Sequence, residues 1–147
     1  MGNRILKENS ILVVDDDEAL TRTIATLLRL DGFEVSTAYN GIAGYASYFC
    51  NPTQFVVTDI QMPQWDGIEM VRSIRALNSE VKIVYVSGAV DRYRTDIEKK
   101  EEIAGALFLE KPFTRKELIE MLAQGFGAAG LMPGMPGDTR VPKSGDF

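Results

Sequence analysis

Histidine is absent from the 147-residue chain, and only one cysteine, Cys50, is present. Without histidine, the protein has no Ser-His-Asp or Cys-His catalytic group and no histidine ligand for a metal ion. A single cysteine excludes an internal disulfide bond and a zinc site built on cysteines. Several common classes of catalytic and metal site are therefore excluded from the start.

Long apolar runs are missing as well. No stretch reaches the length of a membrane span, and residues 1–10 lack the apolar core of a signal peptide. The net charge of −5 argues against direct binding of a nucleic acid, because phosphate backbones require a basic surface. We therefore expect a cytoplasmic protein that interacts with neither membranes nor nucleic acids.

Short apolar runs that stop at a polar residue organise the chain. Residues 55–57 lead to Asp59, and residues 11–14 lead to an acidic run that begins with Asp15. Residues 81–86 stop at Ser87, and residues 106–109 run into Glu110 and Lys111. Short runs of this kind, bounded by loops, are typical of strands that are buried on both faces.

Helical patterns separate these predicted strands. Helices are predicted from about Leu20 to Leu28 and over residues 42–49, 66–77, 91–103 and 114–122, with a further strand at residues 33–39. Strands and helices thus alternate five times. That alternation predicts an α/β fold, with a five-stranded parallel sheet, helices on both faces and right-handed crossovers.

Three helix starts carry capping signals. Asp17 can cap the first helix, while Asp66 with Glu69 and Thr114 with Glu117 have the spacing of capping boxes. We divide the chain into an N-terminal extension at residues 1–9, a folded domain at residues 10–124 and a tail at residues 125–147. The tail is rich in glycine and proline, which is typical of a flexible segment or a linker stub.

The polar residues that follow the predicted strands are expected to meet, because the carboxyl ends of parallel strands share one edge of a sheet. They are Asp15, Asp16, Asp59, Ser87 and Lys111. Three neighbouring carboxylates repel one another unless a cation lies among them, and all-oxygen ligation suits Mg²⁺. A hydroxyl and a lysine can bind phosphoryl oxygens. The set predicts a site for phosphoryl transfer to a carboxylate.

Each of these residues also has a purely structural explanation. Asp59 could cap a strand end, the acids after residue 14 could be solvated, Ser87 could belong to a turn and Lys111 could be a surface charge. Their shared position, each after an apolar strand, favours the functional explanation over the structural one.

The chain resembles the receiver domains of two-component response regulators, including the chemotaxis regulators, over roughly residues 9–124. The matching stretches are ILVVDDD at residues 11–17, TDIQMP at 58–63, DG at 66–67, VSGA at 86–89 and KPF at 111–113. The resemblance implies a flavodoxin-like, doubly wound sheet with strand order 2-1-3-4-5. It also implies a cis peptide bond between Lys111 and Pro112.

The resemblance further implies roles for the site residues. Asp59 would accept a phosphoryl group from a sensor histidine kinase or a phosphotransfer protein. Mg²⁺ would be bound by Asp16, Asp59 and the backbone carbonyl of Gln61, with Asp15 acting on it through water. Ser87 and Lys111 would bind the phosphoryl oxygens. Such a domain is not an enzyme in the usual sense, because it catalyses only its own phosphorylation and dephosphorylation.

The resemblance also implies a conformational switch made of Ser87 and the aromatic residue Phe108. The signal would leave through the fourth helix, the fifth strand and the fifth helix, roughly residues 91–121, toward a downstream protein that the sequence does not name. Phosphorylation-linked homodimerisation is a further option. Phe108 stands where tyrosine is common and has no hydroxyl group. A change in its packing alone would therefore have to signal whether the domain is phosphorylated.

The residues are also compatible with two other functions. The first is a receiver-fold binding module that signals without phosphate, although such modules tend to lose one member of the polar set. The second is a haloacid-dehalogenase-like phosphatase that uses Asp15 and Asp17, a hypothesis that leaves Asp59 without a role. We expect a stand-alone receiver rather than a fragment of a longer regulator.

Overall fold

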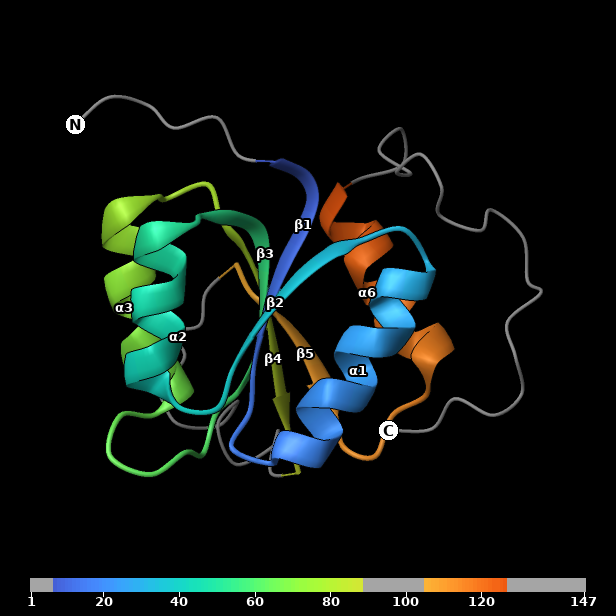
Figure 1. Cartoon of the computed structure of the whole chain (residues 1–147), viewed down its shortest axis with the longest axis horizontal. Helices are drawn as coiled ribbons and strands as arrows, with labels where there is room; N and C mark the ends of the chain where they lie inside the picture. Colours follow the sequence, from blue (N-terminus) through green and yellow to red (C-terminus); the bar gives the residue numbers. More distant parts are fainter. Residues whose placement is uncertain (1–6, 89–104, 127–147) are drawn as a thin grey trace.

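Five parallel strands form the centre of the molecule (Figure 1). The computed structural model describes residues 7–88 and 105–126. The strands are β1 (Lys7–Val14), β2 (Glu34–Ala38), β3 (Thr53–Asp59), β4 (Lys82–Ser87) and β5 (Leu107–Glu110). Their order in the sheet is β2-β1-β3-β4-β5, and every neighbouring pair is parallel. The predicted fold class and strand order are confirmed.

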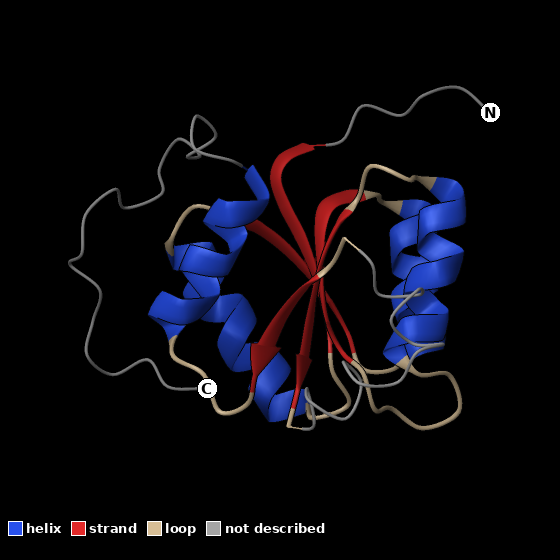
Figure 2. Ribbon diagram, turned by 180° about the vertical axis from the view of Figure 1, so that it is seen from behind, coloured by secondary structure: helices blue, strands red, loops and turns tan. Residues whose placement is uncertain are grey.

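Helices cover both faces of the sheet, and Figure 2 shows them from behind. The described helices are α1 (Glu18–Leu30), α2 (Gly41–Cys50), α3 (Gly67–Leu77) and α6 (Arg115–Phe126). Helices α2 and α3 lie side by side against one face, and α1 and α6 lie against the other. The helix predicted over residues 91–103 lies outside the described residues.

Alternating side chains of each central strand belong to two separate hydrophobic cores, one on each face of the sheet. In β1, Leu12 and Val14 belong to the core under α2 and α3, whereas Ile11 and Val13 belong to the core under α1 and α6. All four are at most 1% exposed. Side chains of a strand point alternately to the two faces, so a run of apolar residues is what burial on both faces requires.

The helix starts follow the predicted caps. Oδ1 of Asp17 accepts a hydrogen bond from the backbone N–H of Leu20 at 3.0 Å. Asp66 and Glu69 form a complete capping box at the start of α3. The Oε1 atom of Glu117 accepts from the backbone N–H of Thr114 at 2.8 Å, and the Thr114 hydroxyl oxygen accepts from the N–H of Glu117 at 3.1 Å. These bonds satisfy backbone donors that a helix start leaves unpaired.

Element boundaries differ from the prediction by a few residues. Strand β1 begins at Lys7, inside the predicted N-terminal extension, and its register with β3 shifts between Lys7 and Ile11. Strand β5 extends to Glu110, which pairs with Ser87 of β4. Helix α6 ends at Phe126, two residues beyond the predicted end of the domain. Within the described ranges, no helix is long and apolar enough to cross a membrane.

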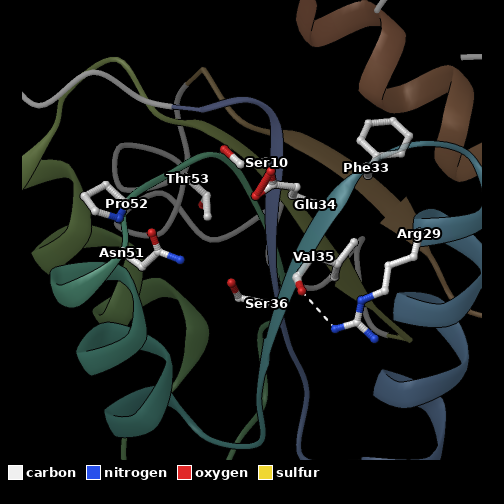
Figure 3. A pocket seen from close by; sticks show the side chains of 9 residues that line it. All are labelled: Ser10, Arg29, Phe33, Glu34, Val35, Ser36, Asn51, Pro52 and Thr53. Atoms are coloured by element: carbon white, nitrogen blue, oxygen red, sulfur yellow. Dashed lines mark hydrogen bonds between the residues drawn. The ribbon is translucent and has the colours of Figure 1, made fainter. Parts of the chain in front are cut away.

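A groove of about 410 Å³ lies at the amino ends of β1, β2 and β3 (Figure 3). Arg29, at the end of α1, donates a hydrogen bond from Nη2 to the backbone oxygen of Val35 at 2.9 Å. This oxygen belongs to the edge strand β2 and is therefore already hydrogen-bonded. This groove is at the opposite end of the strands from Asp59. It therefore belongs to a different part of the molecule from the predicted site.

Candidate functional site

Three carboxylates meet where β1 and β3 end. The two strands are direct neighbours, and Val14 pairs with Thr58 at the end of their ladder. Asp15, Asp16 and Asp59 come directly after this pair and therefore lie at the same edge of the sheet. One carboxylate oxygen from each residue lies within 4.8 Å of the others. Asp15 and Asp59 are buried, whereas Asp16 is exposed. The sheet thus brings together three acids from two distant segments of the sequence.

Lys111 supplies the opposite charge. Its Nζ donates a hydrogen bond to Oδ2 of Asp15 at 2.9 Å and lies 3.8 Å from Oδ2 of Asp59. The peptide bond from Lys111 to Pro112 is cis, as the resemblance implied. The backbone N–H of Lys111 donates to the carbonyl oxygen of Ser87 at 3.0 Å. The loop after β5 is therefore tied to the end of β4 beside the acidic cluster.

The surroundings of Asp59 change its proton affinity. Burial raises the pKa of the Asp59 carboxyl to about 6, and the charges of Asp15 and Asp16 act in the same direction against the opposing effect of Lys111. For Lys111, burial lowers the pKa, but the hydrogen bond to Asp15 and the charge of Asp59 outweigh it, so the pKa is raised. At pH 7 the Asp59 carboxyl is therefore mostly ionised, beside a protonated Lys111.

Two neighbouring residues, Thr58 and Gly67, lie against the backbone carbonyl of Asp59. The hydroxyl of buried Thr58 donates a hydrogen bond to the Asp59 carbonyl oxygen at 2.8 Å. A Cβ atom placed on Gly67 would lie 2.1 Å from that same oxygen. The sequence pattern predicted only a helix start at Gly67 and indicated no role for Thr58. The Asp-Gly pair at residues 66–67 could have indicated this close approach, because glycine is favoured where two backbones lie very near each other.

A second hydroxyl holds the acidic loop after β1. Oγ1 of Thr21, a fully buried residue of α1, lies 3.0 Å from the backbone oxygen of Asp15 and 2.8 Å from that of Asp17. The backbone N–H of Asp17 donates to Oδ1 of Asp15 at 3.0 Å. These bonds orient the loop, and no sequence pattern pointed to Thr21.

The remaining predicted residues lie around this centre. Ser87 ends β4 and is 1% exposed. Gln61 is exposed and lies two residues after Asp59. Phe108 is half-buried on β5, with its ring centroid 5.4 Å from that of Tyr85 and the two planes at 34°. The structure therefore gathers the acids and the lysine, and places the proposed hydroxyl and aromatic residues on the two adjoining strands.

The cluster fits a hard divalent cation. Its donors are all carboxylate oxygens, two of the three acids are buried, and one lysine does not balance three negative charges. Ligands of this kind favour Mg²⁺ over softer metals. Asp15, Asp16 and Asp59 are thus a chemically suitable set for magnesium.

Comparison with known proteins agrees with this geometry. The family of response regulator receiver domains matches residues 11–123. The transcriptional regulatory protein PrrA of Mycobacterium tuberculosis is 38% identical over 112 residues, which are 74% of this chain and 46% of PrrA. The chemotaxis protein CheY of Treponema pallidum is 32% identical over 117 residues, which are 77% of this chain and 79% of CheY.

Solved structures show the same fold. The response regulator protein TrrA of Thermotoga maritima, in complex with Mg(2+)-BeF, has a TM-score of 0.70 and 29% identity, with 79% of this chain and 97% of TrrA covered. The chain spans about half the length of the transcriptional regulators it matches. The match over most of the folded residues shows that this chain belongs to the response regulator receiver domain family of two-component systems.

Proposed function

We propose that Asp59 accepts a phosphoryl group from a phosphohistidine of a sensor kinase or phosphotransfer protein. The main support is the position of Asp59, a buried carboxylate between two further acids and the ammonium of Lys111. Its pKa of about 6 leaves it ionised at pH 7, yet more basic than an ordinary aspartate. A carboxylate oxygen would form the bond to phosphorus while the donor's P–N bond breaks and leaves its electron pair on the imidazole nitrogen.

The acids would hold Mg²⁺ in this reaction. Asp16, Asp59 and the backbone carbonyl of Gln61 are the proposed ligands, with Asp15 acting through water. The bound ion would offset the negative charges of the carboxylates and of the phosphoryl oxygens. The complex of TrrA with Mg(2+)-BeF supports the binding of magnesium by a chain of this family.

Lys111 and Ser87 would bind the oxygens of the transferred group. Nζ of Lys111 already lies 3.8 Å from Asp59, and protonated lysine stabilises the extra negative charge that phosphorylation brings. Ser87 would donate its hydroxyl hydrogen to another phosphoryl oxygen. Movement of Ser87 toward the phosphoryl group would open space beside β5, into which Phe108 would turn.

This switch would change the surface formed by β5, α6 and residues 91–103, the last of which lie outside the described residues. A downstream protein would recognise that surface. The protein would act as a cytoplasmic signalling domain that modifies only itself. The receiver would extend slightly beyond the predicted residues 10–124, because β1 begins at Lys7 and α6 ends at Phe126.

Intact-mass spectrometry tests the proposal. The wild type should gain one phosphoryl group when incubated with acetyl phosphate and Mg²⁺, and should gain none in EDTA. Asp59→Asn should gain none under either condition. The matched control is Asp66→Asn, which replaces the carboxylate that caps α3 with another capping side chain and should be phosphorylated normally. A wild type that never gains mass would instead favour a receiver-fold binding module that works without phosphate.

A further inference from the structure

Helix α2 has a surface unlike that of the other described helices, α1, α3 and α6. None of its ten residues is charged, whereas charged residues make up 25% of the whole sequence. Its inner side, made of Gly41, Gly44 and Tyr48, is buried. Its outer side nevertheless exposes Ile42 at 59% and Phe49 at 52% of their full areas. Helices that are apolar on every side are normally covered on every side.

The exposed residues form one continuous stripe. They are Ile42, Ala43, Ala46, Phe49 and Cys50, which together we call the α2 outer face. Their spacing of i, i+1, i+4, i+7 and i+8 is the pattern with which a helix packs against another helix. The stripe therefore has the form of a packing surface rather than of scattered apolar residues.

Helix α2 cannot rotate to bury this stripe. A Cβ atom on Gly44 would lie 2.6 Å from Sδ of Met70 and 3.0 Å from a methyl group of Val14, so the helix already touches α3 and β1 there. A Cβ atom on Gly41 would lie 2.5 Å from the carbonyl oxygen of Trp65. Because only glycine allows these approaches, the inner side is fixed and the outer side must face away from the domain.

The positions of the stripe are symmetrical about Ala46, and the sizes of the paired side chains are complementary. Ile42 and Cys50 lie four residues before and after it, and Ala43 and Phe49 lie three residues before and after it. In each pair, one side chain is large and the other is small. If two such helices cross antiparallel at Ala46, each large side chain faces a small one, which is the arrangement that packs without voids or clashes.

We propose that the α2 outer face binds the same face of a second copy of this chain, about a twofold axis beside Ala46. Ile42 of each copy then contacts Cys50 of the other, and Phe49 contacts Ala43. One surface patch that serves both copies is the defining feature of a twofold dimer. This proposal does not depend on phosphorylation of Asp59.

Charge favours a second copy over a charged partner. The α2 outer face contains no charged residue, so two copies that meet there place no like charges opposite each other. A charged partner would lose hydration against the α2 outer face and find no opposite charge there. Ring contacts of Tyr45 with Phe49 at 6.3 Å and with Trp65 at 5.8 Å connect the stripe to the loop that follows Asp59.

Sedimentation velocity of the unphosphorylated protein in EDTA tests the dimer. The wild type should shift from monomer to dimer as its concentration rises, and Ala46→Glu should raise the dissociation constant at least about tenfold by placing two carboxylates at the crossing point. Thr26→Glu on α1 is the matched control, since Thr26 is also an exposed and uncharged helical position, and it should dimerise like the wild type. A wild type that stays monomeric at about 0.5 mM, or an Ala46→Glu variant that dimerises as well as the wild type, would overturn the proposal.

Cross-linking tests the geometry. In a Cys50→Ser background, Ala46→Cys should form a disulfide-linked dimer under mild oxidation, because the two Ala46 positions meet at the crossing point and a disulfide needs closely spaced Cα atoms. Thr23→Cys in the same background, at an exposed position on α1, should remain monomeric on a non-reducing gel. Dimers that sediment normally but cross-link no better through position 46 than through position 23 would show that another surface forms them.

Discussion

The Nζ atom of Lys111 lies 2.9 Å from Oδ2 of Asp15, and this contact joins the loop after β5 to the loop after β1. The side chain of Asp15 is 5% exposed and that of Lys111 is 26% exposed, so water screens the pair only in part. Because the same ammonium is 3.8 Å from Asp59, it offsets some of the repulsion between the two buried acids. The remaining repulsion and the burial of Asp59 have consequences that can be measured.

Without a divalent cation, the free energy of unfolding should fall as the pH rises from about 4 to about 6. The pKa of Asp59 is about 6 in the folded protein and 3.8 in an unperturbed aspartate, so in this window the folded state binds the proton more tightly. Rising pH removes a proton that favours folding. Asp59→Asn should lack this decline and be more stable than the wild type at pH 7 in EDTA by on the order of 2 kcal/mol.

Urea unfolding, followed by the fluorescence of the single tryptophan, measures this effect between pH 4.5 and pH 7. Mg²⁺ should reduce the advantage of Asp59→Asn, because the ion offsets the charge that the substitution removes. Parallel stability curves for the two proteins across this pH range would contradict the assigned pKa.

Lys111→Ala should slow phosphorylation by acetyl phosphate at least about tenfold, because it removes a cation that faces the incoming phosphoryl group. Some phosphorylation should remain, but the accompanying change in tryptophan fluorescence or in amide chemical shifts should be lost. Intact mass and the spectra, recorded on the same sample, separate the two effects. Lys116→Ala, an exposed lysine of α6, should behave as the wild type. A full spectral change in phosphorylated Lys111→Ala would refute its role in the response.

Gly67→Ala should destabilise the protein by about 1–3 kcal/mol, because the new methyl group would lie 2.1 Å from the backbone oxygen of Asp59 and one of the two must move. The measurement is the midpoint of urea unfolding. Gly88→Ala is the matched control, since a Cβ atom there has no neighbour within 4 Å among the described residues, and it should change stability by no more than about 0.5 kcal/mol. Equal midpoints for both variants would mean that Gly67 has no steric role.

The buried ion pair between Asp31 and Arg115 should be strongly coupled. Arg115 donates two hydrogen bonds to the Asp31 carboxylate, one of them from Nε at 3.0 Å, and both residues are at most 7% exposed. Arg115→Met leaves a buried carboxylate without its cation and should cost about 3–5 kcal/mol. Adding Asp31→Asn should recover at least about 1 kcal/mol, which a double-mutant cycle in urea measures.

An exposed ion pair on α1 provides the comparison for that cycle. Arg22 and Glu18 are 3.5 Å apart with side chains 62% and 61% exposed. Arg22→Met should cost no more than about 0.5 kcal/mol. If the cycle at Asp31 and Arg115 gave a coupling as small as this, burial would not be what strengthens the pair.

Local patterns in the sequence predicted most of the secondary structure. The run that ends at Asp59 became β3, and the capping signals at Asp17, Asp66 and Thr114 all form the expected hydrogen bonds. These predictions succeeded because a strand buried on two faces and a capped helix each depend on a few neighbouring residues. Boundaries shifted at Lys7 and Glu110, where pairing with a neighbouring strand extended the element.

The class of fold, the order of its elements and the presence of acids, a hydroxyl and a lysine after successive strands all follow from the amino-acid sequence alone. Three features of the site become visible only in the folded chain. Asp15 and Asp59 are buried while Asp16 is exposed, Lys111 bonds to Asp15, and Gly67 packs against the Asp59 backbone. Periodicity and capping act over a few residues, whereas these contacts join segments that are far apart in the chain. Packing of the sheet and helices sets those distances, and no local pattern encodes them.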